Sequence, residues 1–199
     1  MNKRVFLIHG WGGYPEEGWR PWLKNELEKR SFKVYVPKMP DTNNPRLNAW
    51  LEELKKIVET PDKNCYFVGH SLGCITILRY LETLGQNQQI GGVVLVAGFT
   101  DINITIDGDE NINEIKTFFE KEINFDKIKT HCKKFVAIHS DNDPFVPLRY
   151  ADILKEELNA KVIIQNNMKH FSGSDGITKL PIAFSSILEM AGDSTWGVV

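Results

Sequence analysis

Residues 69–73 read Gly-His-Ser-Leu-Gly and match the pattern G-x-S-x-G, which presents a serine hydroxyl as a nucleophile. A short apolar run at 66–68 precedes the pattern, and a mostly apolar helical pattern over 72–84 follows it. A sharp turn between a buried strand and a helix holds the central hydroxyl clear of the sheet. This context favours a nucleophile at Ser71 over an ordinary turn.

A serine nucleophile needs a base to take its proton and a carboxylate to orient that base. In proteins that use this turn, the acid and then the histidine follow the serine on loops at the carboxyl ends of later strands. The apolar run at 135–138 leads into a loop with two aspartates, and the run at 162–164 leads into a loop with His170. His170 is the one histidine after the aspartate loop, so the sequence predicts it as the base.

The residues leave two candidates for the acid, Asp141 and Asp143. They lie two positions apart, so one can face the histidine while the other caps the turn or meets solvent. Residues 143–147, Asp-Pro-Phe-Val-Pro, fit the D-x-x-V-P arrangement that follows this strand in many α/β-hydrolases. That arrangement favours Asp143, with Asp141 as the alternative.

Residues 9–13, His-Gly-Trp-Gly-Gly, follow the first apolar run and let the main chain approach a ligand closely. We expect the oxyanion of an acyl-transfer intermediate to be held by the backbone N–H groups of Trp11 and Leu72. The indoles of Trp11 and Trp19 are candidates for lining the substrate pocket. For Trp19, packing of a helix is an equally good interpretation.

These residues need a sheet that brings the carboxyl ends of several strands to one edge. Apolar runs alternate with helical patterns along the chain, which predicts an α/β fold with a mainly parallel, six-stranded sheet covered by helices on both faces. The expected strands are 5–8, 32–36, 66–68, 93–96, 135–138 and 162–164, and the expected helices begin near Pro21, Asn44, Leu72, Leu148 and Pro181.

We expect a single domain over residues 1–191 and a C-terminal tail over 192–199. One polar excursion, 101–134, interrupts the alternation and includes a helix expected around 112–120. Such a segment is either a small lid or an ordinary surface connection.

Composition and charge indicate an ordinary globular protein: 199 residues, 42% hydrophobic, 25% charged and a net charge of −2. The balanced charge favours neither nucleic acid nor an anionic membrane as a partner. The start of the chain has too short an apolar run for a signal peptide, so we expect a cytoplasmic protein. The three cysteines form no metal-binding pattern, and no metal or cofactor is expected.

Three functions outside acyl chemistry compete with this interpretation. A dinucleotide-binding loop would need a third glycine where Pro15 stands, and a calcium loop opening at Asp107 would need Gly at Ile112 and Glu at Phe118. A non-catalytic binding protein could keep the fold, although every catalytic residue type is present in order. An acyltransferase or a thioesterase would use the same three residues, and the sequence does not separate these from an esterase.

Residues 9–13, 69–73, 140–147 and 169–171 together resemble the retinoblastoma-binding-protein-9-like family of small serine hydrolases. The resemblance implies a six-stranded sheet without a large cap, a Ser71–Asp143–His170 triad, and esterase-like activity on small or hydrophobic acyl groups. One departure is Lys169, which stands where the family usually has glycine. The partner-binding motif of the animal member is not carried over, because residues 72–76 lack its acid.

Overall fold

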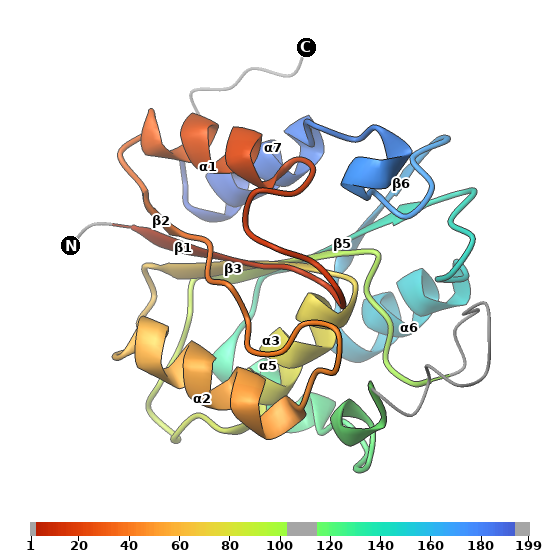
Figure 1. The fold of residues 1–199 in the computed structure, drawn as a ribbon. Coiled ribbons are helices and arrows are strands. Elements are labelled where there is room, and N and C mark those ends of the chain that lie inside the picture. Colours follow the sequence, from red (N-terminus) through yellow and green to blue (C-terminus); the bar gives the residue numbers. More distant parts are fainter. Residues whose placement is uncertain (1–2, 103–114, 194–199) are drawn as a thin grey trace.

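The computed structural model describes residues 3–102 and 115–193 (Figure 1). Within them, six parallel strands form one sheet in the order β2-β1-β3-β4-β5-β6. This confirms the expected α/β sheet. The strands are β1 (Arg4–Ile8), β2 (Lys33–Tyr35), β3 (Cys65–His70), β4 (Gly92–Val96), β5 (Phe135–Ser140) and β6 (Lys161–Gln165).

Helices cover both faces of the sheet (Figure 1). Helices α1 (Arg20–Glu28) and α7 (Pro181–Met190) pack on one face. The other face is covered by α2 (Leu47–Val58), α3 (Leu72–Glu82), α5 (Phe125–His131) and α6 (Arg149–Leu158). Two short 3-10 turns, η2 (Lys116–Phe118) and η3 (Gly173–Asp175), complete the described elements, and no cap domain is built from the described residues.

The two helices that flank β3 in the chain, α2 and α3, differ in how much of their own surface is buried. Helix α2 buries one face, including Trp50 and Leu54, and exposes the charged side chains of Glu52 and Lys55 on the other. Helix α3 is buried along its whole length from Leu72 to Leu81, because it packs against α2 and α5 as well as the sheet. A helix enclosed in this way fixes the position of the turn at its N-terminus.

The excursion at 101–134 contains one helix that the sequence analysis missed, α5. Its start is capped by Asn124, whose Oδ1 accepts a hydrogen bond from the Lys127 amide at 2.9 Å. The buried Arg79 of α3 donates to the carbonyls of Phe118 and Glu122, at 3.0 and 3.1 Å, and so fastens the described end of the excursion to the body of the protein. Residues 103–114 lie outside the described residues, and with them the first three residues of the helix expected at 112–120; the described part, 115–120, contains the short 3-10 turn η2.

All three cysteines are unpaired and buried: Cys65, Cys74 and Cys132. Burial raises the pKa of the Cys65 thiol to about 11 and that of Cys132 to about 12. Each therefore stays a neutral thiol that packs as a small apolar side chain. Across residues 3–102 and 115–193, no helix is both long and apolar enough to cross a membrane.

Candidate active site

Ser71 occupies a sharp turn between the end of β3 and the start of α3. Its backbone has φ 54° and ψ −120°, in a region that residues with a side chain rarely adopt. Such a conformation costs about 1–3 kcal/mol and persists only where the surroundings enforce it. Here the Ser71 amide donates to the Val96 carbonyl at 2.9 Å, and the Ser71 carbonyl accepts from the Cys74 amide at 2.9 Å.

The two glycines of this turn are required by close backbone contacts. A Cβ on Gly73 would lie 2.3 Å from the carbonyl oxygen of Ile8, and one on Gly69 would lie 2.7 Å from the Cys74 nitrogen. Both neighbours are backbone atoms that cannot move aside. The absence of side chains at 69 and 73 thus lets α3 begin directly against β1 and β3, with Ser71 at the carboxyl edge of the sheet.

Asp143 and His170 form a hydrogen-bonded pair at the same edge. The Nδ1 of His170 lies 2.9 Å from Oδ2 and 3.2 Å from Oδ1 of Asp143, so Nδ1–H donates to the carboxylate. The Asp143 side chain is only 2% exposed, and its Oδ1 also accepts from the amides of Phe145 and Val146, at 2.9 and 3.0 Å. The carboxylate is thereby fixed in place and fixes the tautomer of His170, whose Nε2 is left with its lone pair.

Asp141, the alternative acid, has a different task. Its Oδ1 accepts a hydrogen bond from the Asn167 amide at 2.8 Å, and the residue is exposed. It therefore supports the backbone of the loop that carries His170, without contact to the imidazole. The geometry brings Asp143 rather than Asp141 into contact with His170.

The turn that carries Ser71 contacts the loop that carries His170. The contact is made by His70, the residue that precedes the serine. The rings of His70 and His170 are 5.0 Å apart, and His70 Nε2 lies 2.7 Å from the carbonyl oxygen of His170. Among the described residues, no hydrogen bond joins Ser71 Oγ to His170 itself. Bonds of this kind are often long without substrate and shorten in the reacting complex.

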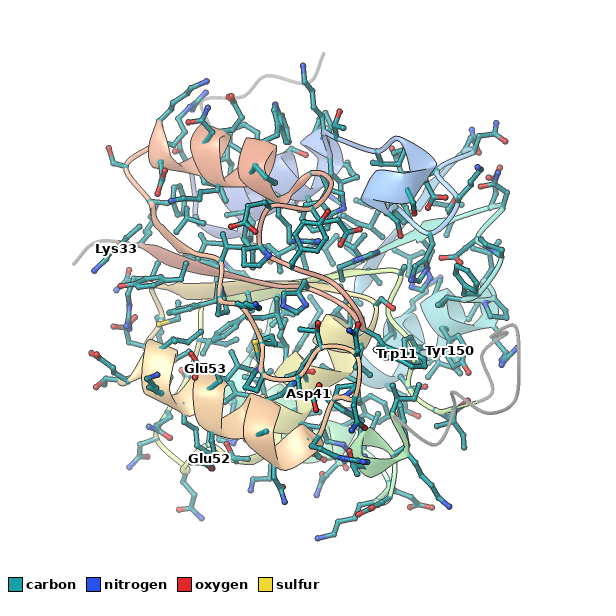
Figure 2. All side chains as sticks on the ribbon, in the orientation of Figure 1. Trp11, Lys33, Asp41, Glu52, Glu53 and Tyr150 are labelled. Atoms are coloured by element: carbon teal, nitrogen blue, oxygen red, sulfur yellow. The ribbon has the colours of Figure 1, made fainter. Side chains whose placement is uncertain are left out.

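Two backbone amides, those of Trp11 and Leu72, are predicted to hold an oxyanion. The N–H groups of Trp11 and Leu72 donate to no acceptor among the described residues, whereas the Gly12 amide is bonded to Thr42. A Cβ on Gly10 would lie 3.0 Å from Ser71 Cβ, so the loop after β1 runs directly against the serine. The half-buried Trp11 donates its indole N–H to the Asn43 carbonyl at 3.0 Å and projects from that loop in Figure 2.

The proteins similar to this chain include serine hydrolases. A family model described as serine hydrolase matches residues 5–189. The YdeN protein of Bacillus subtilis is 33% identical over 184 residues, which cover 92% of this chain and 94% of that protein. Serine hydrolase RBBP9 of Rattus norvegicus is 28% identical over 169 residues, or 84% of this chain and 85% of that one. The chain belongs to the serine hydrolase family.

The solved structures agree with that assignment. The crystal structure of the ydeN gene product from B. subtilis matches with a TM-score of 0.87 at 30% identity and covers 96% of this chain and all of that one. Est1E from Butyrivibrio proteoclasticus matches at 0.74 with 16% identity, which shows a shared fold. The resemblance inferred from the motifs is thereby confirmed, and so is the compact α/β-hydrolase fold.

Trp19 of this serine hydrolase does not line a substrate pocket, contrary to one of the two interpretations of the sequence. Its side chain is only 1% exposed, and its indole N–H donates to the carbonyl of Phe171 at 3.0 Å. The ring also packs edge-on against His70, with centroids 6.0 Å apart. Because the indole is enclosed by protein, Trp19 supports the loop that carries His170 from the interior of the protein.

Lys169 stands in that loop at a backbone position that suits the glycine expected from the resemblance. Lys169 has φ 48°, in the left-handed region where glycine is favoured. Its side chain is exposed and its Nζ lies 4.0 Å from Asp175 Oδ1. The departure from the family pattern therefore adds local backbone strain and a positive charge outside the loop, while the turn itself is kept.

The four histidines that precede the aspartate loop in the chain, His9, His70, His131 and His139, are all buried. His9 holds the loop after β1: its Nδ1–H donates to Gly10 at 2.8 Å, and its Nε2 accepts from the Met39 amide at 3.1 Å. These partners fix a neutral imidazole, and burial lowers its pKa. Within the described residues, no group of three or more His, Cys, Asp or Glu side chains is placed to hold a metal ion.

His139, at the end of β5, is expected to make the stability of the fold sensitive to acid. It is 1% exposed, and neither ring nitrogen has a hydrogen-bond partner among the described residues. Burial lowers its pKa to about 4, although the charges of Asp143 and Asp152 act in the opposite direction. The unfolded chain binds a proton near pH 6.5 and the folded chain does not, so stability falls as the pH drops from about 6.5 towards 4.

We expect urea denaturation to show a loss of about 2 kcal/mol between pH 7 and pH 5 from this residue. The variant His139→Leu should have a shallower pH dependence, with about one proton fewer taken up on unfolding. Equal pH dependence in both proteins would show that His139 is protonated as easily in the folded chain as in the unfolded one.

Proposed function

We propose that this serine hydrolase cleaves carboxylic esters of small or hydrophobic acyl groups through an acyl-enzyme on Ser71. One observation carries the proposal: the His170–Asp143 pair stands beside the strained turn that presents the Ser71 hydroxyl. Nucleophile, base and orienting acid are the parts that ester hydrolysis requires. They come from the loops after β3, β5 and β6.

In the first step His170 Nε2 takes the proton of Ser71 Oγ as that oxygen attacks the ester carbonyl carbon. The carbonyl oxygen becomes an oxyanion, which the amides of Trp11 and Leu72 stabilise. The Asp143 carboxylate stabilises the imidazolium. His170 then gives its proton to the alkoxide, which leaves as an alcohol when the C–O bond breaks, and the acyl group stays on Ser71.

In the second step water replaces the alcohol. His170 takes a proton from the water, whose oxygen attacks the acyl carbon, and the same two amides hold the second oxyanion. When this intermediate collapses, His170 returns the proton to Ser71 Oγ, and the carboxylic acid is released. The enzyme is regenerated without any other reactant.

Fluorophosphonate labelling tests this function. We expect the probe to modify the native protein at a single site, located by peptide mass analysis at Ser71, and to leave Ser71→Ala unmodified. Hydrolysis of an ester series of increasing acyl length, beside thioesters and with added alcohol acceptors, then separates an esterase from a thioesterase or an acyltransferase. A native protein that neither labels nor hydrolyses any of these substrates would be a binding protein that has kept the fold.

The leaving-group side of the site is lined by Phe145. Its ring stands edge-on to His170, with centroids 5.1 Å apart, and it is 37% exposed. Because His170 protonates the leaving alcohol, a group in contact with this imidazole lies where that alcohol departs. Leu148, another exposed apolar side chain, follows in the same segment. We therefore expect a preference for alcohols with apolar surface.

Phe145→Ala should weaken the binding of esters with large apolar alcohols. Losing an aromatic contact of this size corresponds to about 1–2 kcal/mol, or a rise in KM of roughly 5- to 30-fold, with kcat changed only a few-fold. Methyl esters of the same acid serve as the control and should be hardly affected. A uniform loss over both kinds of ester would contradict a role in the leaving-group site.

A further inference from the structure

The loop that carries the base has an unusual backbone. Asn167, Lys169 and Phe171 have φ of 58°, 48° and 58°, so left-handed residues stand on both sides of His170. For residues other than glycine and asparagine, this left-handed conformation costs about 1 kcal/mol or more. This conformation persists only if neighbouring groups hold it, and the identity of those groups decides where the imidazole lies.

The amide side of the loop is held by the loop of the acid. The amides of Asn167, Met168 and Lys169 donate to side chains of residues 140–142, at 2.8, 3.0 and 2.8 Å. The His170 amide donates to Asp175 Oδ2 at 3.1 Å. These bonds fix His170 relative to Asp143, and none of them reaches the nucleophile.

The carbonyl side is held from the interior of the protein. His70 Nε2 lies 2.7 Å from the His170 carbonyl oxygen, and Trp19 donates to the next carbonyl, that of Phe171, at 3.0 Å. Since a carbonyl can only accept, the proton lies on Nε2 of His70. Among the hydrogen bonds of the described residues, this is the one that joins the nucleophile's turn directly to the base.

We propose that His70 is a positioning residue for the base, and that its hydrogen bond to the His170 carbonyl sets the position of the imidazole relative to Ser71. His70 precedes the nucleophile and ends β3, where its backbone pairs with Val96 of β4. The nucleophile and the donor are therefore carried by the same rigid strand end. A donor fixed in this way holds His170 at a constant position relative to the serine hydroxyl. The loop of residues 140–142 holds His170 at a constant position relative to Asp143.

The state of His70 agrees with that role. It is 4% exposed, and burial, with contributions from the nearby His170 and Arg20, holds its pKa well below the usual value. The ring thus stays neutral, with its proton on Nε2, while His170 gains and loses charge during the reaction. Trp19 packs edge-on against the ring and keeps it turned towards the loop.

The proposal rests on the proposed function and is tested with three variants. His70→Gln keeps an N–H donor near the place of Nε2, His70→Leu removes it, and His131→Leu is the matched control. His131 is also buried and also bonds to a backbone carbonyl, that of Gln88 at 2.8 Å. It differs in lying just before the amino end of β5, whereas Ser71 and His170 follow the carboxyl ends of their strands. For each variant kcat, KM and the rate of fluorophosphonate labelling are measured beside the melting temperature.

We expect His70→Leu to lose roughly 10- to 100-fold in kcat and in labelling rate with KM almost unchanged, because a misplaced base lowers the rate without weakening binding. His70→Gln should recover most of that loss. His131→Leu should be destabilised to a similar degree and keep its kcat. The proposal is overturned if His70→Leu keeps its kcat, or if the Gln and Leu variants are equally slow.

These outcomes are separate from a failure of the proposed function. If Ser71 is not the nucleophile, the unchanged protein is not labelled at Ser71. If only the role of His70 is wrong, the unchanged protein labels and turns over, and His70→Leu does so at the same rate.

Discussion

Ser71→Gly is expected to abolish ester hydrolysis and at the same time to make the protein more stable. Removal of the hydroxyl takes away the nucleophile, so kcat should fall by at least about 10⁴-fold. The backbone at φ 54° and ψ −120° is unstrained for glycine and strained for any other residue. Relief of that strain, less the extra freedom of glycine in the unfolded chain, leaves a net gain of about 1 kcal/mol.

Ser71→Ala is the matched control for this prediction. Alanine also lacks the hydroxyl, so activity should be lost to the same degree. It keeps a Cβ in the strained turn, so its free energy of unfolding should stay close to that of the unchanged protein. Urea denaturation of the three proteins measures the difference. If glycine and alanine are equally stable, the turn stores no strain at this residue.

Asp143→Asn is expected to lower kcat by about 10⁴-fold while leaving the fold intact. Oδ1 of Asp143 accepts two backbone amides, those of Phe145 and Val146, whereas Oδ2 faces His170 at 2.9 Å. An asparagine would keep its oxygen on the amides and turn its NH₂ group towards Nδ1 of His170. The imidazole would then carry its proton on Nε2 and could not accept one from Ser71.

Asp141→Asn provides the comparison for this variant. Asparagine retains the oxygen that accepts from the Asn167 amide, so the loop is preserved, and kcat should stay within a few-fold of the original. The two substitutions are chemically identical and lie two residues apart. If Asp141→Asn proved the more damaging, the acid of the triad would have to be reassigned.

The sequence predicts much of this fold because the signals are strong and local. Apolar runs buried on both sides give the central strands, and the elbow glycines at 69 and 73 are demanded by backbone contacts that any protein with this turn must make. The chain order of Ser71, Asp143 and His170 then follows from the order of the loops. The choice between Asp141 and Asp143 depends on side-chain direction, which the spacing alone does not fix.

What the sequence does not reveal depends on contacts between distant segments. His70 is a variable position of the G-x-S-x-G pattern, and only the folded chain shows its bond to a carbonyl 100 residues away. Trp19 carries the same hydrophobic character whether it lines a pocket or packs inside, and the structure places it inside. Helix α5 is short and has a weak apolar pattern, with Asn124 as its clearest signal.

The reactivity of the three buried cysteines can be used to measure how often the core of this protein opens. A thiol reagent in solution cannot reach Cys65, Cys74 or Cys132 until the surrounding structure separates, because each side chain is at most 2% exposed. The rate of their modification therefore reports how often the core opens. Ser71, by contrast, is only half-buried at the carboxyl end of β3, so we expect a fluorophosphonate to reach it without any opening. Two probes of different chemistry, applied to one sample, thus distinguish a variant that has lost its activity from one that has lost its fold.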